Sequence, residues 1–143
     1  MPESNRTVMR LQWRLHKALW NASGGRLGRR ILGMPVVEVV MIGRRSGSDR
    51  QILIMYVDDG GSPAIVGTNA GRDSEPAWAH SLRARPDVAA RWEGRWREVR
   101  AVEIDGDDRE RVWARAVAAN PGYAKYAEGL TRPIPIFRLA PQT

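Results

Sequence analysis

The residue types best suited to binding chemistry are concentrated in residues 43–50. This segment reads Gly-Arg-Arg-Ser-Gly-Ser-Asp-Arg, so three guanidinium groups flank two hydroxyls within eight residues. A guanidinium can hold a phosphate through two parallel hydrogen bonds, and each charge-assisted bond contributes about 1.5–3 kcal/mol. The two glycines allow backbone N–H groups to approach a ligand closely. The pattern therefore indicates a phosphate site, and a solvated hairpin loop of the same composition stays open as the alternative.

The charge distribution points to an anionic partner near the same segment. The net charge of +7 comes entirely from residues 1–50, which hold ten Lys or Arg against three Asp or Glu, whereas residues 51–143 hold thirteen of each sign. Such asymmetry is typical of proteins that bind a nucleic acid, an acidic lipid surface or a phosphorylated small molecule. Charge alone does not distinguish these three partners.

Metal and thiol chemistry are not expected. The 143 residues include no cysteine, and His16 and His80 are the only imidazoles. Disulfides and a cysteine nucleophile are therefore excluded, and no metal site is predicted. The acidic pairs at residues 58–59 and 107–108 lie in a turn-like segment and at a helix start, where solvation or the helix dipole accounts for them. We predict neither a catalytic triad nor a pair of catalytic carboxylates.

The elements that must position the basic segment are strands. Residues 36–42 are almost all β-branched or apolar and are followed by turn chemistry, which predicts a strand that enters the basic loop. Residues 51–57 and 64–68 predict two further strands, separated by a turn that is rich in Asp, Gly and Pro. We expect these three strands to form an antiparallel meander.

The rest of the chain mixes helices and strands irregularly. Ser74 as a cap and Pro76 in the first turn predict a helix that runs to about Arg83. Further patterns predict a hairpin turning at Gly94, a helix, a helical turn and a last strand, at residues 88–104, 109–120, 123–130 and 134–139. The Gly-x-Gly-x-x-Gly fingerprint of dinucleotide folds is absent. About six antiparallel strands with flanking helices predict a mainly β, α+β fold, a barrel or half-barrel plugged by helices.

The N-terminal region predicts an amphipathic helix, residues 1–25, ahead of one domain at residues 26–143. Within it, residues 6–21 place apolar side chains at three- and four-residue spacings and basic ones on other faces. This helix either packs on the barrel or a second subunit, or lies on an anionic membrane. No apolar run reaches the roughly 18 residues that span a bilayer, and no signal peptide is evident. We therefore expect a cytoplasmic protein, with peripheral contact at the inner face of the plasma membrane as an alternative.

Three groups of short motifs follow one another along residues 30–140. They are Gly43-Arg44-Arg45-Ser46-Gly47 with Arg50, Gly67-Thr68-Asn69-Ala70-Gly71 followed by Pro76-Ala77-Trp78-Ala79-His80-Ser81-Leu82-Arg83-Ala84-Arg85-Pro86, and Pro121-Gly122-Tyr123-Ala124-Lys125-Tyr126 with Thr131-Arg132-Pro133-Ile134-Pro135. In their order and spacing the chain resembles the deazaflavin-dependent nitroreductase family, also described as F420H2-dependent quinone reductases. It departs from that family at Ala79 and Ser81, where relatives carry an aromatic residue and an asparagine, and at Ala70, where a second glycine is frequent.

The resemblance implies a split β-barrel like that of the flavin-binding pyridoxamine-phosphate oxidases, with coenzyme F420 as the cofactor and FMN as the alternative. It implies that the phosphate and acidic glutamyl tail of F420 bind the basic turn, at Arg44, Arg45, Ser46, Gly47 and Arg50. Arginine supplies the permanent positive charge that a polyanionic tail requires. The resemblance also places Thr68, Asn69 and Gly71 under the deazaflavin ring or its ribityl chain. Trp78 is expected beside the cofactor, or else in ordinary core packing.

Two tyrosines are the candidate catalytic residues. Tyr123 and Tyr126 stand three positions apart, so in a helix they share a face. In the family, tyrosines of this segment line the substrate side of the ring. The resemblance thus implies that they orient the acceptor and donate a hydrogen bond to developing oxyanion character; core packing is the alternative. His80 is expected to be a partnered helix histidine rather than an acid catalyst.

The function implied is transfer of a hydride from reduced F420 to a quinone-like or nitroaromatic acceptor. A deazaflavin delivers the hydride from its own ring, so the protein contributes placement rather than a nucleophile. A flavin or deazaflavin carrier without turnover is one alternative. A nucleic-acid-binding protein is disfavoured, because the six tryptophans are dispersed in apolar segments. The expected partner is a small electron acceptor and not a nucleic acid, and a homodimer stays open.

Overall fold

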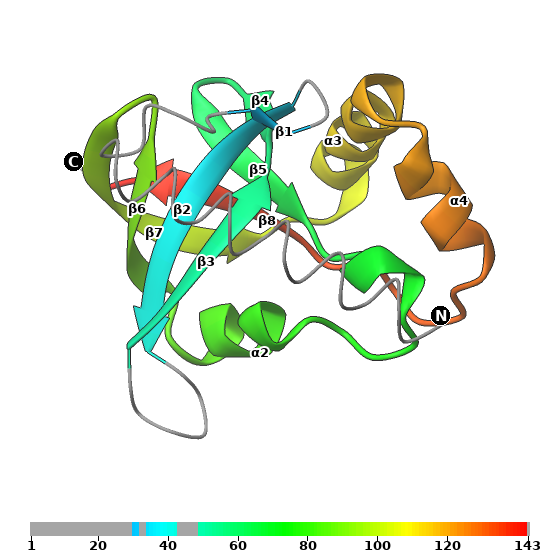
Figure 1. Ribbon diagram of the computed structural model, residues 1–143, viewed down its shortest axis with the longest axis horizontal. Helices are drawn as coiled ribbons and strands as arrows, with labels where there is room; N and C mark the ends of the chain where they lie inside the picture. The colour runs from blue at the N-terminus through cyan, green and yellow to red at the C-terminus, as the bar shows by residue number, and fades with distance from the viewer. Residues whose placement is uncertain (1–29, 32–33, 43–48, 143) are drawn as a thin grey trace.

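Antiparallel strands form the frame of the molecule. The computed structural model of the chain describes residues 30–31, 34–42 and 49–142. Its strands are β1 (Arg30–Ile31), β2 (Met34–Ile42), β3 (Asp49–Met55), β4 (Val57–Asp59), β5 (Ser62–Val66), β6 (Asp87–Trp92), β7 (Arg95–Glu103) and β8 (Ile136–Pro141). Within the described residues these eight strands form one sheet in the order β1-β2-β6-β7-β8-β5-β4, and β3 also pairs with β2. The sheet curls into a half-barrel (Figure 1), which confirms the predicted split-barrel architecture.

The predicted strands lie in this sheet, and the order of the predicted meander is confirmed, although its second strand is divided into β3 and β4. The first two strands pair as expected, along residues 36–42 of β2 and 49–55 of β3. The predicted second strand, residues 51–57, is divided at Tyr56: β3 pairs with β2, and β4 pairs with β5 from Val57 opposite Ala64. Alternating polarity fixes which face a strand buries, but not which strand lies beside it. On its other edge β5 pairs with β8, where the buried Ile65 lies opposite the buried Phe137, and this pairing was not predicted.

The predicted hairpin between β6 and β7 is confirmed. The strands pair from Asp87 with Arg100 to Trp92 with Arg95. The two residues between them, Glu93 and Gly94, have φ values of 52° and 76°. Positive φ at both central positions is what a two-residue turn of type I′ requires, because its twist matches that of the flanking strands.

Three α-helices and one short 3-10 turn accompany the sheet in the described part of the chain. They are η1 (Asn69–Gly71), α2 (Ala77–Ala84), α3 (Gly106–Ala119) and α4 (Gly122–Glu128). Figure 1 shows α2 below the sheet, whereas α3 and α4 lie together at its side. The predicted cap Ser74 is wrong: Pro76 is the N-cap of α2, and the Ser74 carbonyl accepts a hydrogen bond from Asn69 instead. None of these helices is long and apolar enough to cross a membrane.

Strand β8 divides the core into two parts. Successive side chains of a strand point to opposite faces. Phe137 thus belongs to a buried cluster that includes Leu82 of α2, whereas Ile136 belongs to a second cluster that includes Val112 of α3 and Tyr123 of α4. One strand therefore fixes α2 on one side and the α3–α4 pair on the other.

A buried ion pair explains the charged residue in the otherwise apolar β2. The side chain of Glu38 is 2% exposed, and its Oε1 lies 2.7 Å from Nη2 of Arg91 on the neighbouring β6. The Arg91 side chain is itself only 13% exposed. A buried carboxylate without a partner is strongly unfavourable, so the arginine makes the burial of Glu38 possible.

Two predicted features fall outside the described residues. They are the N-terminal helix, residues 1–25, and the first six residues of the basic turn, residues 43–48. The boundary between the predicted N-terminal segment and the domain from residue 26 onward stays a prediction.

Candidate functional site

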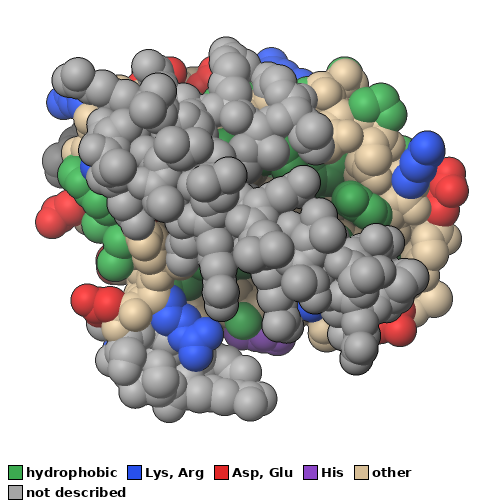
Figure 2. All heavy atoms as spheres, viewed as in Figure 1, with side chains coloured by type: hydrophobic (Ala, Val, Ile, Leu, Met, Phe, Trp, Pro, Cys, Tyr) green, Lys and Arg blue, Asp and Glu red, His purple; other side chains and the backbone are tan. Residues whose placement is uncertain are grey.

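Of the predicted phosphate contacts, Arg50 is the one that lies among the described residues. It lies in β3 opposite Met41 of β2, and it is exposed. Side chains of Lys and Arg (blue) reach the surface near this end of β3 on the face drawn in Figure 2. The other predicted contacts lie outside the described residues, at Arg44, Arg45, Ser46 and Gly47.

The predicted ring-binding residues form a tight turn at the end of β5. Thr68 is buried, and its backbone has the right-handed helical conformation, with φ −70° and ψ −23°. The next residues, Asn69, Ala70 and Gly71, have φ values of 51°, 54° and 80°. The Gly71 N–H donates to the Thr68 carbonyl over 3.0 Å, and the Arg72 N–H donates to the Asn69 carbonyl over 3.1 Å. These two bonds close the turn.

The backbone of this turn is suited to an electron-rich ligand atom. A right-handed residue followed by a left-handed one turns successive N–H groups toward one concave side, a geometry that binds anions. The N–H groups of Asn69 and Ala70 donate to no other described residue. Left-handed backbone at a residue such as Ala70 costs about 1–3 kcal/mol and persists where the surroundings determine it.

One arginine from a distant segment supplies those surroundings. Nη2 of Arg132 donates to the Thr68 carbonyl over 3.0 Å, and Nη1 donates to the Gly67 carbonyl over 3.3 Å. Nε and Nη2 donate to the Arg72 carbonyl over 3.2 and 3.0 Å. Nη1 also donates to the carbonyl of Pro133 over 3.1 Å. The Arg132 guanidinium therefore holds the backbone on both sides of the turn.

Helix α4 carries both predicted catalytic tyrosines and brings Tyr126 to the turn. A Cβ on Gly71 would lie 3.3 Å from Cδ1 of Tyr126, whose side chain is exposed. Tyr123 is only 6% exposed and packs at a tilt against Trp113 of α3, with the ring centroids 6.5 Å apart. Burial, reinforced by the neighbouring Tyr126, raises the pKa of Tyr123. The two tyrosines are thus neighbours on α4, but only Tyr126 is open to solvent.

Trp78 of α2, a predicted cofactor contact, is packed in part against the core. The Trp78 side chain is half-buried, and its ring meets Phe137 edge-on at a centroid distance of 5.9 Å. His80, two residues along, lies 3.6 Å from a carboxylate oxygen of Glu75. The expectation that His80 is a partnered helix histidine fits this contact.

Arg83 binds two carboxylates at once. Its Nη1 and Nη2 donate to Glu75 over 2.6 and 2.9 Å, and its Nε and Nη2 donate to Glu103 of β7 over 2.8 and 2.9 Å. The Arg83 hydrogen bonds hold the pKa values of both carboxyls below their usual range, although burial opposes this. The pair of fork-like contacts ties α2 and the segment before it to β7.

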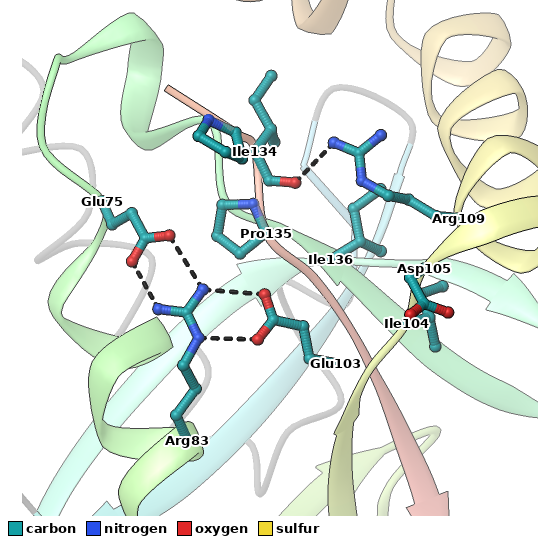
Figure 3. A pocket seen from close by; sticks show the side chains of 10 residues that line it. Glu75, Arg83, Glu103, Ile104, Asp105, Arg109, Ile134, Pro135 and Ile136 are labelled. Carbon is teal, nitrogen blue, oxygen red and sulfur yellow. Dashed lines mark hydrogen bonds and ion pairs between the residues drawn. The ribbon is translucent and has the colours of Figure 1, made fainter. Parts of the chain in front are cut away.

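This ion cluster forms one wall of a pocket of about 330 Å³ (Figure 3). The pocket floor is apolar, from Ile104 and residues 133–136. Arg109 reaches across the other wall and donates to the Ile134 carbonyl over 2.8 Å. The guanidinium groups of both pocket arginines, Arg83 and Arg109, therefore already bind other residues that line the pocket. None of the predicted site residues is among the described residues that line it.

Sequence reasoning gave no role to Arg83 or Arg132. Both occur in the motifs that carry the family resemblance, which was the only signal available. Their partners lie 20 and 64 residues away along the chain, at Glu103 and Thr68. No local pattern connects residues at such separations.

Comparisons with known proteins agree with the geometry. A family model described as F420H2-dependent quinone reductase matches residues 12–141. An F420H2-dependent quinone reductase of Mycobacterium tuberculosis (strain ATCC 25618 / H37Rv) is 36% identical over 76 residues, which are 52% of this chain and 51% of the relative. The match thus spans about half the length of the curated relatives.

Two solved structures extend the similarity over more of the chain. An F420-H2-dependent reductase, FDR-A, is 32% identical with a TM-score of 0.67, and the match covers 73% of this chain and 93% of that one. A protein described as a domain-swapped dimer is 27% identical with a TM-score of 0.69, over 96% of this chain and 99% of that one. Since the family model covers nearly the whole sequence, the predicted resemblance is confirmed: the chain belongs to the F420H2-dependent quinone reductase family.

Proposed function

We propose that this protein uses reduced coenzyme F420 to reduce a quinone-like or nitroaromatic acceptor. The observation that carries the proposal is the contact between Gly71 of η1 and Tyr126 of α4. It joins the turn expected beneath the cofactor ring to the helix expected on the acceptor side. The names of the matched family and of its relatives support the same reaction.

The residues present fit the cofactor. The N–H groups of Asn69 and Ala70, which donate to no other described residue, suit an electron-rich oxygen such as a ring carbonyl. The exposed Arg50, together with the basic residues at 44 and 45, suits the phosphate and the acidic tail. Trp78 is half-buried, so part of its ring stays available as an apolar surface for the cofactor. Reduced F420 supplies the hydride when it is bound, so the chain has to bind, orient and exclude water.

The two tyrosines have different parts in this proposal. Tyr126 is 41% exposed and is the one that can touch an acceptor. Tyr123 is buried beside it on α4, and burial raises the pKa of its phenol above the ordinary value. A phenol hydrogen bond to the acceptor oxygen stabilises the negative charge that develops there. Orientation of the acceptor against the cofactor ring accounts for the remaining rate.

Binding titrations followed by a turnover assay test the proposal. The protein is titrated with F420, FMN and a short oligonucleotide, and is then mixed anaerobically with reduced F420 and menadione. We expect F420 to bind most tightly and its oxidation to require the protein. Oligonucleotide binding without F420 binding contradicts the proposal. F420 binding without oxidation by menadione or a nitroaromatic acceptor supports the carrier alternative instead.

We also propose that two copies of the chain associate. Support comes from the relative described as a domain-swapped dimer, which matches almost the full chain. Light scattering at micromolar concentration tests this, and a mass of about one chain contradicts it.

We propose that the protein is located in the cytosol. We also propose that residues 6–21 can contact an anionic membrane. The basic and apolar residues of that segment support it. Sedimentation with anionic vesicles is measured for the full chain and for a variant lacking residues 1–25. Equal binding of the two proteins rules out the membrane contact.

A further inference from the structure

Arg132 contacts the backbone on both sides of the turn at residues 68–71. All three of its guanidinium nitrogens donate hydrogen bonds to the carbonyl oxygens of Gly67, Thr68 and Arg72, and Nη1 also donates to the adjacent Pro133. Gly67 and Thr68 come directly before the left-handed stretch and Arg72 comes directly after it. The arginine therefore spans the turn and fixes where the backbone enters and leaves it.

The turn needs such a support. Three consecutive residues, Asn69 to Gly71, have positive φ, and Ala70 carries a Cβ that disfavours this conformation. The turn itself supplies two backbone hydrogen bonds. Backbone of this kind persists when its surroundings determine it. A planar guanidinium with rigidly placed donors loses little conformational freedom for each bond it forms, and an ammonium cannot reproduce that geometry.

We propose that Arg132 is a positioning residue, which fixes the turn and through it the distance between the cofactor ring and the acceptor side of α4. This inference rests on the proposed function. Its donors are directed at backbone carbonyls, so it acts through the turn and not by touching the reacting atoms. Gly71 of the turn contacts Tyr126 of α4. The position of the turn therefore also sets the position of the cofactor side relative to the acceptor side.

Arg109 provides a matched control. Arg132 belongs to the segment at residues 131–135, and Arg109 holds that segment by donating to the Ile134 carbonyl over 2.8 Å. Unlike Arg132, Arg109 donates to no carbonyl of residues 67–72. The variant Arg109→Ala therefore removes a guanidinium that holds this segment and leaves the turn intact. A comparison of Arg132→Ala with Arg109→Ala separates a positioning role from general support of the segment.

Hydrogen exchange of the protein without cofactor gives the first test. We expect amide exchange in residues 67–72 to be about tenfold faster in Arg132→Ala than in the wild type, and to be unchanged in Arg109→Ala. The variant Arg132→Lys should behave like Arg132→Ala, because an ammonium lacks the fork. Unchanged exchange in both Arg132 variants overturns the inference, whether or not the protein oxidises reduced F420.

Steady-state kinetics with reduced F420 and menadione give the second test. We expect kcat to fall about 10- to 100-fold in Arg132→Ala, as for a misplaced reacting group, with KM for menadione changed less than threefold. Guanidinium chloride at millimolar concentration should restore kcat in Arg132→Ala, and sodium chloride at the same concentration should not. Equal kcat in Arg132→Ala and the wild type, or an equal loss in Arg109→Ala, overturns the inference. A wild type without turnover contradicts the proposed function instead, and the exchange test still decides whether Arg132 fixes the turn.

Discussion

Gly71 lies against the ring of Tyr126, so that a Cβ at position 71 would stand 3.3 Å from Cδ1 of the tyrosine and 3.7 Å from its Cα. The φ of Gly71 is +80°, a conformation that L side chains rarely adopt. The contact is possible because position 71 has no side chain. It brings together two segments that are 55 residues apart in the sequence, 71 and 126.

Gly71→Ala should separate the turn from α4. The left-handed conformation costs an alanine about 1–2 kcal/mol, and the added methyl also presses on Tyr126. We expect the free energy of unfolding in urea to fall by at least this amount and F420H2 oxidation to fall about tenfold. Gly94→Ala is the control, since its φ is +76° and nothing lies within 4 Å of an added Cβ. An equal loss of turnover in both variants contradicts the proposed coupling.

Ala70→Gly should stabilise the protein. Ala70 is exposed and left-handed, with φ 54° and ψ 33°. Glycine removes about 1–2 kcal/mol of steric cost, partly offset by about 0.5–1 kcal/mol of added unfolded-state entropy. We expect a net gain of up to about 1.5 kcal/mol in urea unfolding. Ala114→Gly, at an exposed position of α3, should lose about 1 kcal/mol instead. Similar losses in the two variants would show that Ala70 is not strained.

Removal of the tyrosine hydroxyls tests the acceptor side. Tyr126→Phe keeps the ring against Gly71, so we expect stability and F420 affinity to stay unchanged while kcat/KM for menadione falls several-fold. The double variant with Tyr123→Phe should lower turnover further. Tyr56→Phe, which alters a buried tyrosine of the barrel core, serves as the control. If the double variant has the turnover and the F420 affinity of the wild type, both tyrosines are structural.

Acid should destabilise the protein through its ion clusters. Hydrogen bonds from Arg83 lower the pKa values of Glu75 and Glu103. A carboxyl whose pKa is lower in the folded state contributes stability above its unfolded pKa, here 4.5, and loses it as the pH falls through the folded value. We expect the free energy of unfolding to be steady near neutral pH and to fall below about pH 4.5.

The variant Arg83→Gln tests whether the loss of stability below about pH 4.5 comes from Glu75 and Glu103. It should be less stable than the wild type at pH 7, and the difference should shrink as the pH falls, because protonated carboxyls no longer attract Arg83. Arg100→Gln is the control, since its ion pair with Asp87 is exposed on both sides and contributes little. Parallel curves for Arg83→Gln and the wild type down to pH 3 would assign this loss to other groups, such as the buried Asp59 with Arg111 and Arg138.

Local patterns determined most of the elements from the sequence alone. The β-branched run of β2, the turn at Gly94 and the helical spacing of α3 each depend on neighbours within a few residues, which is the range over which periodicity and turn chemistry act. The candidate residues at 68–71 and 123–126 were likewise found from short motifs. Their order along the chain led to the family that the comparisons then showed.

Only the tertiary structure decided which of these segments meet. The pairing of β5 with β8, the burial of Tyr123 beside the exposed Tyr126, and the reach of Arg132 to Thr68 all join distant parts of the chain. Their common cause is closure of the sheet around β8, which places residues 132–137 beside residues 64–68. A strand can satisfy its hydrogen bonds and bury its apolar face against several partners, so the choice among them depends on how the whole barrel packs.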